Sequence, residues 1–331
     1  MSAADTTTAK TPPARPAPSS DGGGVPPQMP RKKRAAGSAA TPWALLAPCL
    51  LILVLVLGYP LVRLVTLSFQ KFGQAQLWGF QDPESVGFDN FSAILGDSQF
   101  WQVVVRTIVF AAGAVILTMV IGMLIALLLQ KVSGWVKMLI NVALVATWGM
   151  PIIVATTVFK WLFDSDYGVL NALLSKLPGV EMVGHNWFAS GTQGLAVIML
   201  LVIWGAVPFV VITLSAGLTQ VPKELEEAAR LDGSGAWKVF RYVTLPILKP
   251  IIVMLATLSV IWDMGVFPQV FVMRNGHPED EFQLLTTYSY DRAFQVNDYS
   301  QGSAIALLTV ILLLGVVAVY MRQMLKIGEV E

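Results

Sequence analysis

Six stretches of this 331-residue chain are each about 20 residues or longer and almost entirely apolar. A helix of about 20 apolar residues crosses the roughly 30 Å hydrocarbon core of a membrane. Because every backbone polar group in lipid must find its partner within its own helix, we expect an all-α polytopic membrane protein. The six predicted transmembrane helices are residues 43–68, 103–130, 137–163, 194–219, 250–273 and 303–322.

The charge content agrees with that expectation. Only 13% of the residues are charged and 55% are hydrophobic, whereas a soluble domain has roughly 25% charged residues. A chain this poor in charge excludes an ordinary soluble enzyme, a disordered regulator and a nucleic-acid binder. The single cysteine, Cys49, excludes an intrachain disulfide.

Prolines inside several of the predicted spans indicate bent helices. Pro151 lies in the third span, Pro208 in the fourth and Pro268 in the fifth. Membrane helices tolerate proline because neighbouring helices can satisfy the carbonyl that it frees. Proline usually kinks the helix that contains it.

The first 42 residues differ from the rest of the chain. They are rich in Ala and Pro, with a basic cluster at residues 31–34. So few large apolar side chains cannot offset the entropy lost on ordering, and we expect a disordered cytoplasmic tail. It lacks the apolar core of a cleaved signal peptide. The six-helix transmembrane domain is predicted to cover residues 43–325.

The distribution of Lys and Arg predicts the orientation. With the N-terminus inside, the cytoplasmic segments hold 14 of these residues and the outer loops hold five. Basic residues are enriched in cytoplasmic loops of membrane proteins. We therefore expect both termini to be cytoplasmic.

The cytoplasmic loop at residues 220–249 has the composition of a small folded unit. Pro222 suits the first turn of a helix, and Gly233 is a natural residue to end it in a left-handed conformation. Ser234 is expected to cap a second short helix, which Pro246 would interrupt. The loop is thus predicted to be a helix–turn–helix on the cytoplasmic face.

Charge pattern alone fits a second interpretation of this loop equally well. The loop could be a solvated amphipathic connector without a partner. The pairs Lys223–Glu227 and Glu226–Arg230 at i, i+4 spacing would stabilise such a helix by a few tenths of a kcal/mol each.

A longer pattern in the same loop favours the first interpretation. It consists of Glu227-Ala228-Ala229, three residues, Gly233, nine residues and then Val243-Thr244-Leu245-Pro246. This pattern resembles the EAA loop of binding-protein-dependent ABC importer permeases. The resemblance covers nearly all of residues 43–325 and is greatest with the maltose-type sugar permeases, on the side of the first permease subunit.

Motifs outside the loop add to this resemblance. Residues 87–91, Gly-Phe-Asp-Asn-Phe, are similar to the group's first outer loop, and Trp204 and Pro208-Phe209 to its approach to the EAA loop. One segment departs from the pattern. Residues 274–278, Arg-Asn-Gly-His-Pro, stand where many relatives have a glycine-rich turn, which leaves the contacts of that outer loop open.

The resemblance implies the ABC type I importer permease fold and a set of partners. These are a second permease subunit in a heterodimer, two ATP-binding subunits and an extracellular solute-binding lipoprotein, in the lipid of a bacterial cytoplasmic membrane. ATP and Mg would be used by the partner ATPase, with no cofactor bound by this chain and no nucleic acid. The sequence agrees, since no G-x-x-x-x-G-K-[ST] motif is present to cradle nucleotide phosphates.

The resemblance also implies roles for residues of the EAA loop. Glu227 would pair with a cation on the ATPase, Ala228 and Ala229 would allow close backbone approach, and Gly233 would form the turn. Trp237 and Phe240 would fill apolar slots. The complete set of expected coupling residues is Glu227, Ala228, Ala229, Asp232, Gly233, Trp237, Phe240, Leu245 and Pro246.

A single acid lies inside a predicted span, and such residues are costly and usually functional. This is Asp263, and Ser259 and Phe267 recur with it at i, i+4, i+8 on one expected helix face. Carboxylates accept hydrogen bonds from sugar hydroxyls, and aromatic faces stack on sugar rings. A structural role in pairing two helices stays open. The expected substrate-pathway residues are Ser259, Trp262, Asp263, Phe267, Trp204, Gly205, Trp148 and Thr156.

The predicted function is the permease subunit of an ATP-driven importer for a sugar, a di- or oligosaccharide. An ion-coupled secondary transporter is the alternative, although such proteins usually carry internal repeats and several buried acids. A glycerol-phosphate-type or other solute is a further alternative within the importer class. A metal site and catalysis are not expected, because the two histidines, His185 and His277, lie in different outer loops.

Overall fold

The computed structural model describes residues 40–328, and the side chains of residues 43–322. The predicted tail therefore lies outside the described residues, basic cluster included, except for three residues that begin the first helix. The chain divides into two units, one ending at Val56 and one starting at Leu57. In the first unit, α1 (Ala40–Leu53) continues into the π-helical turn η1 (Val54–Gly58), and its apolar side chains are exposed.

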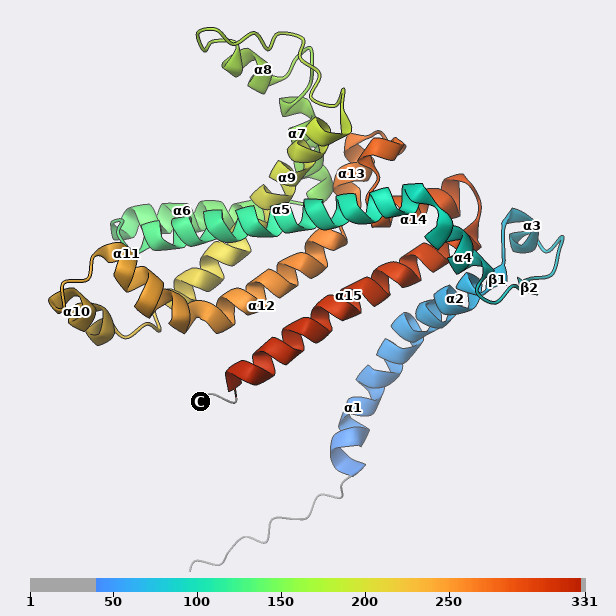
Figure 1. The fold of residues 1–331 in the computed structure, drawn as a ribbon, viewed down its shortest axis with the longest axis horizontal. Coiled ribbons are helices and arrows are strands. Elements are labelled where there is room, and N and C mark those ends of the chain that lie inside the picture. Colours follow the sequence, from blue (N-terminus) through green and yellow to red (C-terminus); the bar gives the residue numbers. More distant parts are fainter. Residues whose placement is uncertain (1–39, 329–331) are drawn as a thin grey trace, which may run out of the picture. The chain divides into compact units, whose positions relative to one another are not determined.

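The second unit is built almost entirely of helices (Figure 1). Its elements are α2 (Tyr59–Ser68), β1 (Gln70–Lys71), α3 (Gln74–Leu77), β2 (Glu84–Ser85), α4 (Asp89–Gly96), α5 (Ser98–Leu129), α6 (Gly134–Trp148), α7 (Ile152–Leu162), α8 (Val169–Leu174), α9 (Gly191–Leu218), α10 (Lys223–Leu231), α11 (Ala236–Val239), the π-helical turn η2 (Phe240–Thr244), α12 (Leu245–Met264), α13 (Pro268–Met273), the 3-10 turn η3 (Asp280–Phe282), α14 (Leu285–Tyr290), the π-helical turn η4 (Asp291–Gln295) and α15 (Tyr299–Gly328). The two strands pair antiparallel in a small outer hairpin.

The core forms where α5 and α9 pack along each other, with α12 against both. Ile198 and Leu201 of α9 are fully buried in it, together with Phe110 of α5. A Cβ added at Gly122 of α5 would lie 2.5 Å from Val210 Cγ1 of α9. Small residues of this kind let membrane helices approach closely, since their association depends on van der Waals packing.

The predicted transmembrane helices are present with two differences. Five described helical segments are long and apolar enough to cross a membrane, and a bent pair brings the number to six. The pair is α6 and α7, which meet at 101° beside Pro151. The expected bend in the third span is therefore a complete break. Pro208, by contrast, lies inside α9 without ending it.

The predicted outer end of the fifth span, residues 250–273, is wrong. One continuous helix runs from Ala236 to Met264, and α13 is a separate short helix that begins at Pro268. Proline lacks the N–H that would continue the helix, and its ring clashes with the carbonyl four residues earlier. The continuous helix therefore starts within the predicted cytoplasmic loop and ends at Met264, before Pro268.

Figure 1 shows which elements of the second unit lie at each end of its long helices. The coupling-loop elements α10 and α11 lie at one end of α5 and α12, whereas α13 and α14 lie at the other end. In the predicted orientation the first end faces the cytoplasm and the second faces outward. The segment containing α8 projects from α7 beyond the outer end.

The projecting α8 segment is organised around one buried amide, that of Asn171. Its Nδ2 donates to the carbonyls of Asp164, Ser165 and His185, and its Oδ1 accepts from Trp187 Nε1 at 2.6 Å. One side chain thereby closes both ends of a loop that has little apolar core of its own.

Replacing Asn171 by alanine is expected to loosen this segment without affecting the membrane helices. Each polar group left buried and unpaired costs about 1–3 kcal/mol, and Trp187 Nε1 would be one of them. Limited proteolysis of the α8 segment should become roughly tenfold faster. Asn186→Ala is the matched control, because the exposed side chain of Asn186 makes one hydrogen bond among the described residues, accepting from the backbone N–H of Phe188. Equal cleavage rates for the two variants would contradict this role of Asn171.

Residues 274–278, the segment that differs from the pattern of the sugar permeases, begin with Arg274, whose contacts stabilise this outer loop. Its Nε donates to Glu279 Oε2 at 2.8 Å, and its guanidinium lies 4.1 Å from the centre of the Phe282 ring. The hydrogen bond from Arg274 holds the pKa of the Glu279 carboxyl below its ordinary value. This contact fixes η3 against the outer end of α9, where Gly191 leaves room for it: a Cβ there would lie 2.6 Å from the Glu281 carbonyl.

Candidate functional site

A cleft of about 270 Å³ lies where the break between α6 and α7 meets α9 and α12. We call it the membrane cleft. Its lining residues are Thr147, Trp148, Met150, Ile152, Ala155, Leu201, Val202, Trp204, Gly205, Ala206, Phe209, Trp262, Asp263, Val266 and Gln269. The cleft exists because the two helical breaks, at Pro151 and after Met264, lie beside each other and leave space that continuous helices would fill.

Two polar groups of the membrane cleft are hydrogen-bond acceptors without partners among the described residues. Asp263 is 3% exposed, and its Oδ2 is buried with no hydrogen bond to any described residue. The same holds for Oε1 of Gln269. Buried polar groups are rarely left without a hydrogen-bond partner in folded proteins. Two such acceptors in one cleft indicate a place where a ligand could donate hydrogen bonds. The two residues come from different elements, α12 and α13.

Aromatic rings also line the cleft. Trp148 at the end of α6 stacks on Phe209 of α9, with ring centroids 5.7 Å apart. Phe209 also meets Trp262 edge to face, with centroids 5.4 Å apart. Trp148 and Trp262 are both about half exposed, so the aromatic side of the cleft is open. The cleft thus combines acceptors with ring faces, which suits a ligand that carries both hydroxyl groups and apolar faces.

Five of the eight predicted pathway residues line the membrane cleft: Trp148, Trp204, Gly205, Trp262 and Asp263. Two others are buried beside it without lining it. Thr156 donates its hydroxyl to the carbonyl of Ile152 within α7. Ser259 is buried on α12, one turn before the cleft.

The predicted helix face of Ser259, Asp263 and Phe267 is wrong for its last member. Helix α12 ends at Met264, and Phe267 is the residue just before α13. Phe267 therefore does not share a helix face with Ser259 and Asp263. Its ring stacks on Phe271, with centroids 5.0 Å apart. Phe267 therefore belongs to an aromatic cluster at the outer end and does not line the cleft.

Two lining residues were missed by sequence reasoning about polar and stacking groups. These are Gln269 and Phe209. On a single helix covering residues 250–273, Gln269 would not share the face of Asp263. An amide inside an apolar segment and directly after a proline was the available signal for Gln269.

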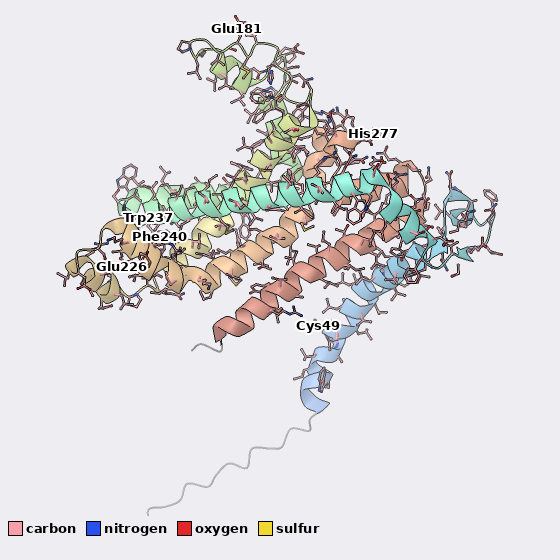
Figure 2. The ribbon with its side chains drawn as sticks, in the orientation of Figure 1. Cys49, Glu181, Glu226, Trp237, Phe240 and His277 are labelled. Carbon is pink, nitrogen blue, oxygen red and sulfur yellow. The ribbon has the colours of Figure 1, made fainter. Side chains whose placement is uncertain are left out.

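The predicted coupling residues lie on and after α10, at the end of the second unit that is predicted to face the cytoplasm. Gly233 has φ +81°, and the N–H of Ser234 donates to the carbonyl of Ala229. This is the left-handed glycine turn expected from the sequence. Figure 2 shows Glu226, Trp237 and Phe240 gathered at this end of the second unit. The Trp237 and Phe240 rings are 5.7 Å apart.

One acid ties α10 to the helix that enters the membrane. Glu226 accepts a hydrogen bond from the Thr244 hydroxyl at 3.1 Å and forms an ion pair with Arg230. The neighbouring Glu227 is exposed, and within the described part of the chain it has no ion pair or side-chain hydrogen bond; the pair with Lys223 considered from the sequence is absent there. Glu227 is thus available to a partner, while Glu226 is occupied internally.

Apolar side chains of this end are directed into solvent. Leu231 is 90% exposed, and Trp237 and Tyr242 are each more than 70% exposed. Large apolar side chains this exposed, at an end predicted to face the cytoplasm, are typical of an interaction site. Three of the remaining coupling residues are exposed: Ala228, Asp232 and Pro246. Two are half-buried: Ala229 and Leu245.

The predicted second short helix is wrong in two respects. Gly235 precedes α11, so Ser234 is not its cap. Pro246 does not interrupt the helix, which continues from Ala236 to Met264. The π-helical turn η2 ends just before Pro246, where Pro246 occupies the first turn of α12. Because the ladder of hydrogen bonds already changes register there, the missing N–H costs little. The Glu226–Thr244 hydrogen bond therefore joins α10 to the continuous helix that carries Asp263.

Comparison with known proteins places this geometry in context. Residues 118–326 match the family described as "Binding-protein-dependent transport system inner membrane component". The chain is 42% identical over 294 residues to the diacetylchitobiose uptake system permease protein DasB of Streptomyces coelicolor, covering 89% of each chain. It is 33% identical to the sulfoquinovosyl glycerol transport system permease protein SmoG of Agrobacterium fabrum, covering 84% of this chain and 88% of that protein.

A solved structure has a similar fold. A bacterial alginate ABC transporter, in complex with a periplasmic protein carrying an alginate pentasaccharide, contains a chain that matches with a TM-score of 0.72. The match covers 86% of this chain and 94% of that one, at 18% sequence identity. Both the family match and this fold agree with the expected all-helical permease architecture.

Proposed function

Because the chain belongs to the binding-protein-dependent transport system inner membrane components, the permeases of ABC importers, we propose that it passes a carbohydrate across the membrane. It is a multi-pass transport subunit of a complex with a solute-binding protein and ATPase subunits. We infer that the substrate is a di- or oligosaccharide. The diacetylchitobiose and sulfoquinovosyl glycerol permeases, both similar over most of this chain, support that class.

The observation that carries this proposal is the membrane cleft. Its unpaired acceptors, Asp263 Oδ2 and Gln269 Oε1, would receive hydroxyl protons, and the rings of Trp148 and Trp262 would lie against apolar faces of the sugar. None of the lining residues is Lys or Arg. A phosphate-bearing solute would need such cations, so the glycerol-phosphate alternative is disfavoured.

The open side of the cleft supports a second permease subunit. Trp148 and Trp262 are half exposed at membrane depth, and a sugar held there would face lipid. A heterodimer partner covering this side would complete the substrate pathway. Two ATP-binding subunits would dock at the cytoplasmic end, one of them on α10, and an extracellular solute-binding lipoprotein would dock at the outer end.

Coupling would run from α10 to the cleft along one continuous helix. The ATPase would contact Glu227 and the exposed apolar patch, and the Glu226–Thr244 hydrogen bond would carry displacement of α10 into the span that ends at Met264. In this assignment the protein resides in the cytoplasmic membrane of a bacterium with both termini inside.

Uptake by the assembled transporter in proteoliposomes tests the proposal. We expect absolute dependence on ATP, the ATPase subunits and the binding protein, and no effect of an ionophore. Collapse of uptake by the ionophore with ATP still present would indicate the ion-coupled alternative. Measuring which sugar the partner binding protein retains would then define the substrate.

Leu231→Ser should weaken docking of the ATPase subunit by roughly tenfold, because burial of a leucine contributes about 1.5–3 kcal/mol. The affinity of purified ATPase for the reconstituted permease measures this effect. Val183→Ser is the matched control, since Val183 is 88% exposed in the outer α8 segment. An equal affinity for both variants would exclude Leu231 from the docking surface.

A further inference from the structure

A second cavity, of about 310 Å³, lies between the outer ends of α5 and α9. We call it the interfacial groove. Its polar residues are Arg106, Thr192 and Glu281, and its apolar residues include Val109, Phe110 and Met199. It is separate from the membrane cleft, and no residue lines both.

The groove lies at the depth of the lipid headgroups. Helix α5 has 32 residues, whereas about 20 residues span the hydrocarbon core. Counting about 20 residues back from Leu129 places the outer edge of the hydrocarbon near Phe110. Arg106 lies one turn further out. The same count on α9 from Leu218 places that edge near Met199, with Thr192 beyond it.

Arg106 is anchored with part of its hydrogen-bonding capacity left over. Its Nη1 donates to the carbonyls of Asp280 at 2.5 Å and Gln283 at 3.0 Å. A guanidinium has five N–H donors, and the fork formed by Nε and Nη2 matches two oxygens of a phosphate. Within the described residues, this fork has no hydrogen-bond partner.

Glu281 places an opposite charge on the same groove without neutralising Arg106. The two residues line it together, yet no ion pair within 4.0 Å joins them in the described part of the chain. The carboxylate is exposed, and its backbone is fixed by the contact of η3 with Gly191. The interfacial groove thus carries the Arg106 guanidinium and the Glu281 carboxylate as separate charges beside apolar side chains.

We propose that the interfacial groove binds a phosphatidylethanolamine molecule of the outer leaflet. The phosphate would bind the free fork of Arg106, the primary ammonium would donate to Glu281, and an acyl chain would lie along Val109, Phe110 and Met199. An anionic headgroup without an ammonium would be repelled by Glu281, and a choline headgroup has no N–H to donate. Amphipathic channels of this kind recognise lipid by headgroup charge and apolar area together.

Native mass spectrometry of the complete transporter, extracted from vesicles of equal phosphatidylethanolamine and phosphatidylglycerol content, tests this proposal. Glu281→Gln should lower the retained phosphatidylethanolamine by roughly threefold to fivefold, the range expected for one exposed charge contact. Glu281→Lys should reverse the preference, so that phosphatidylglycerol is retained instead. A reversed preference cannot result from misfolding.

Two control variants carry the same charge changes elsewhere on the outer side. Glu181→Lys lies on the α8 segment (Figure 2). Arg106→Gln should lower the retained phosphatidylethanolamine, because the phosphate loses its fork, and Arg63→Gln on α2 is its control. Neither Glu181→Lys nor Arg63→Gln should alter lipid preference. An unchanged preference in Glu281→Lys would overturn the proposal. So would crosslinking of a Val109→Cys variant to a partner subunit instead of to lipid, because the groove would then be covered by protein.

Discussion

Replacing Asp263 by alanine is expected to lower sugar uptake by about 10–100-fold, because hydrogen bonds to a charged group contribute roughly 1.5–3 kcal/mol each. The reason lies in its surroundings. Asp263 is buried in the membrane cleft, and its Oδ2 has no protein partner among the described residues. Its hydrogen-bonding capacity is therefore unused within these residues. ATP-driven uptake of the cognate sugar in proteoliposomes, measured over a range of sugar concentrations, provides the readout.

A second variant separates this role from a structural one. Asp263→Asn keeps the size of the side chain and removes the buried carboxylate, so the protein should be at least as stable to heat as the wild type. If Asp263 instead paired two helices, Asn and Ala would both lower the melting temperature. Ser259→Ala is the matched control on the same helix, because Ser259 is buried one turn earlier and does not line the cleft. Normal uptake by Asp263→Ala would remove Asp263 from the pathway.

Gly233→Asp is expected to uncouple ATP hydrolysis from transport while leaving the protein in the membrane. Gly233 has φ +81°, a conformation that costs other residues about 1–2 kcal/mol. A negative charge at the C-terminal end of α10 adds about 0.3–1 kcal/mol against the helix dipole. Together these terms predict a loss of uptake of roughly 10–100-fold. Immunoblotting of membranes and uptake assays measure the two quantities separately.

The chain contains matched controls for each cause. Gly235 lies two residues away in an extended conformation, and a Cβ there would meet open space, so Gly235→Ala should be nearly neutral. Gly179 has φ +82° in the outer α8 segment, with open space around it. Gly179→Asp imposes a similar backbone strain away from the ATPase side. If it impaired transport as strongly as Gly233→Asp, strain in general would explain the effect and the coupling assignment would fail.

Sequence reasoning located the long helices well because their signal is local. An apolar run long enough to span the membrane is visible without any neighbour, and Gly233 predicts its own turn. It failed at residues 250–273, where apolar composition continues from α12 into α13. Composition does not distinguish one helix from two, and the break after Met264 depends on what Pro268 and its neighbours pack against.

The same limit affected the roles of individual acids. Glu226 and Glu227 are adjacent and alike in sequence, but only the fold brings Thr244 within hydrogen-bond distance of Glu226 and leaves Glu227 exposed. Likewise, the sequence marked Asp263 as exceptional because an acid in a span is costly. It did not indicate that Gln269 would lie beside the same cleft.

By itself, the sequence determined that this protein crosses a membrane several times and which loop resembles a coupling motif. It also predicted the orientation in the membrane. These properties follow from chain-local quantities: hydrophobic length, the placement of basic residues and the spacing of a motif. The tertiary structure decided that the membrane cleft exists at all, because it forms only where the break beside Pro151 meets the end of α12. The physical reason is that a cleft is space left unfilled between helices, and such space is a property of their packing and of no single segment.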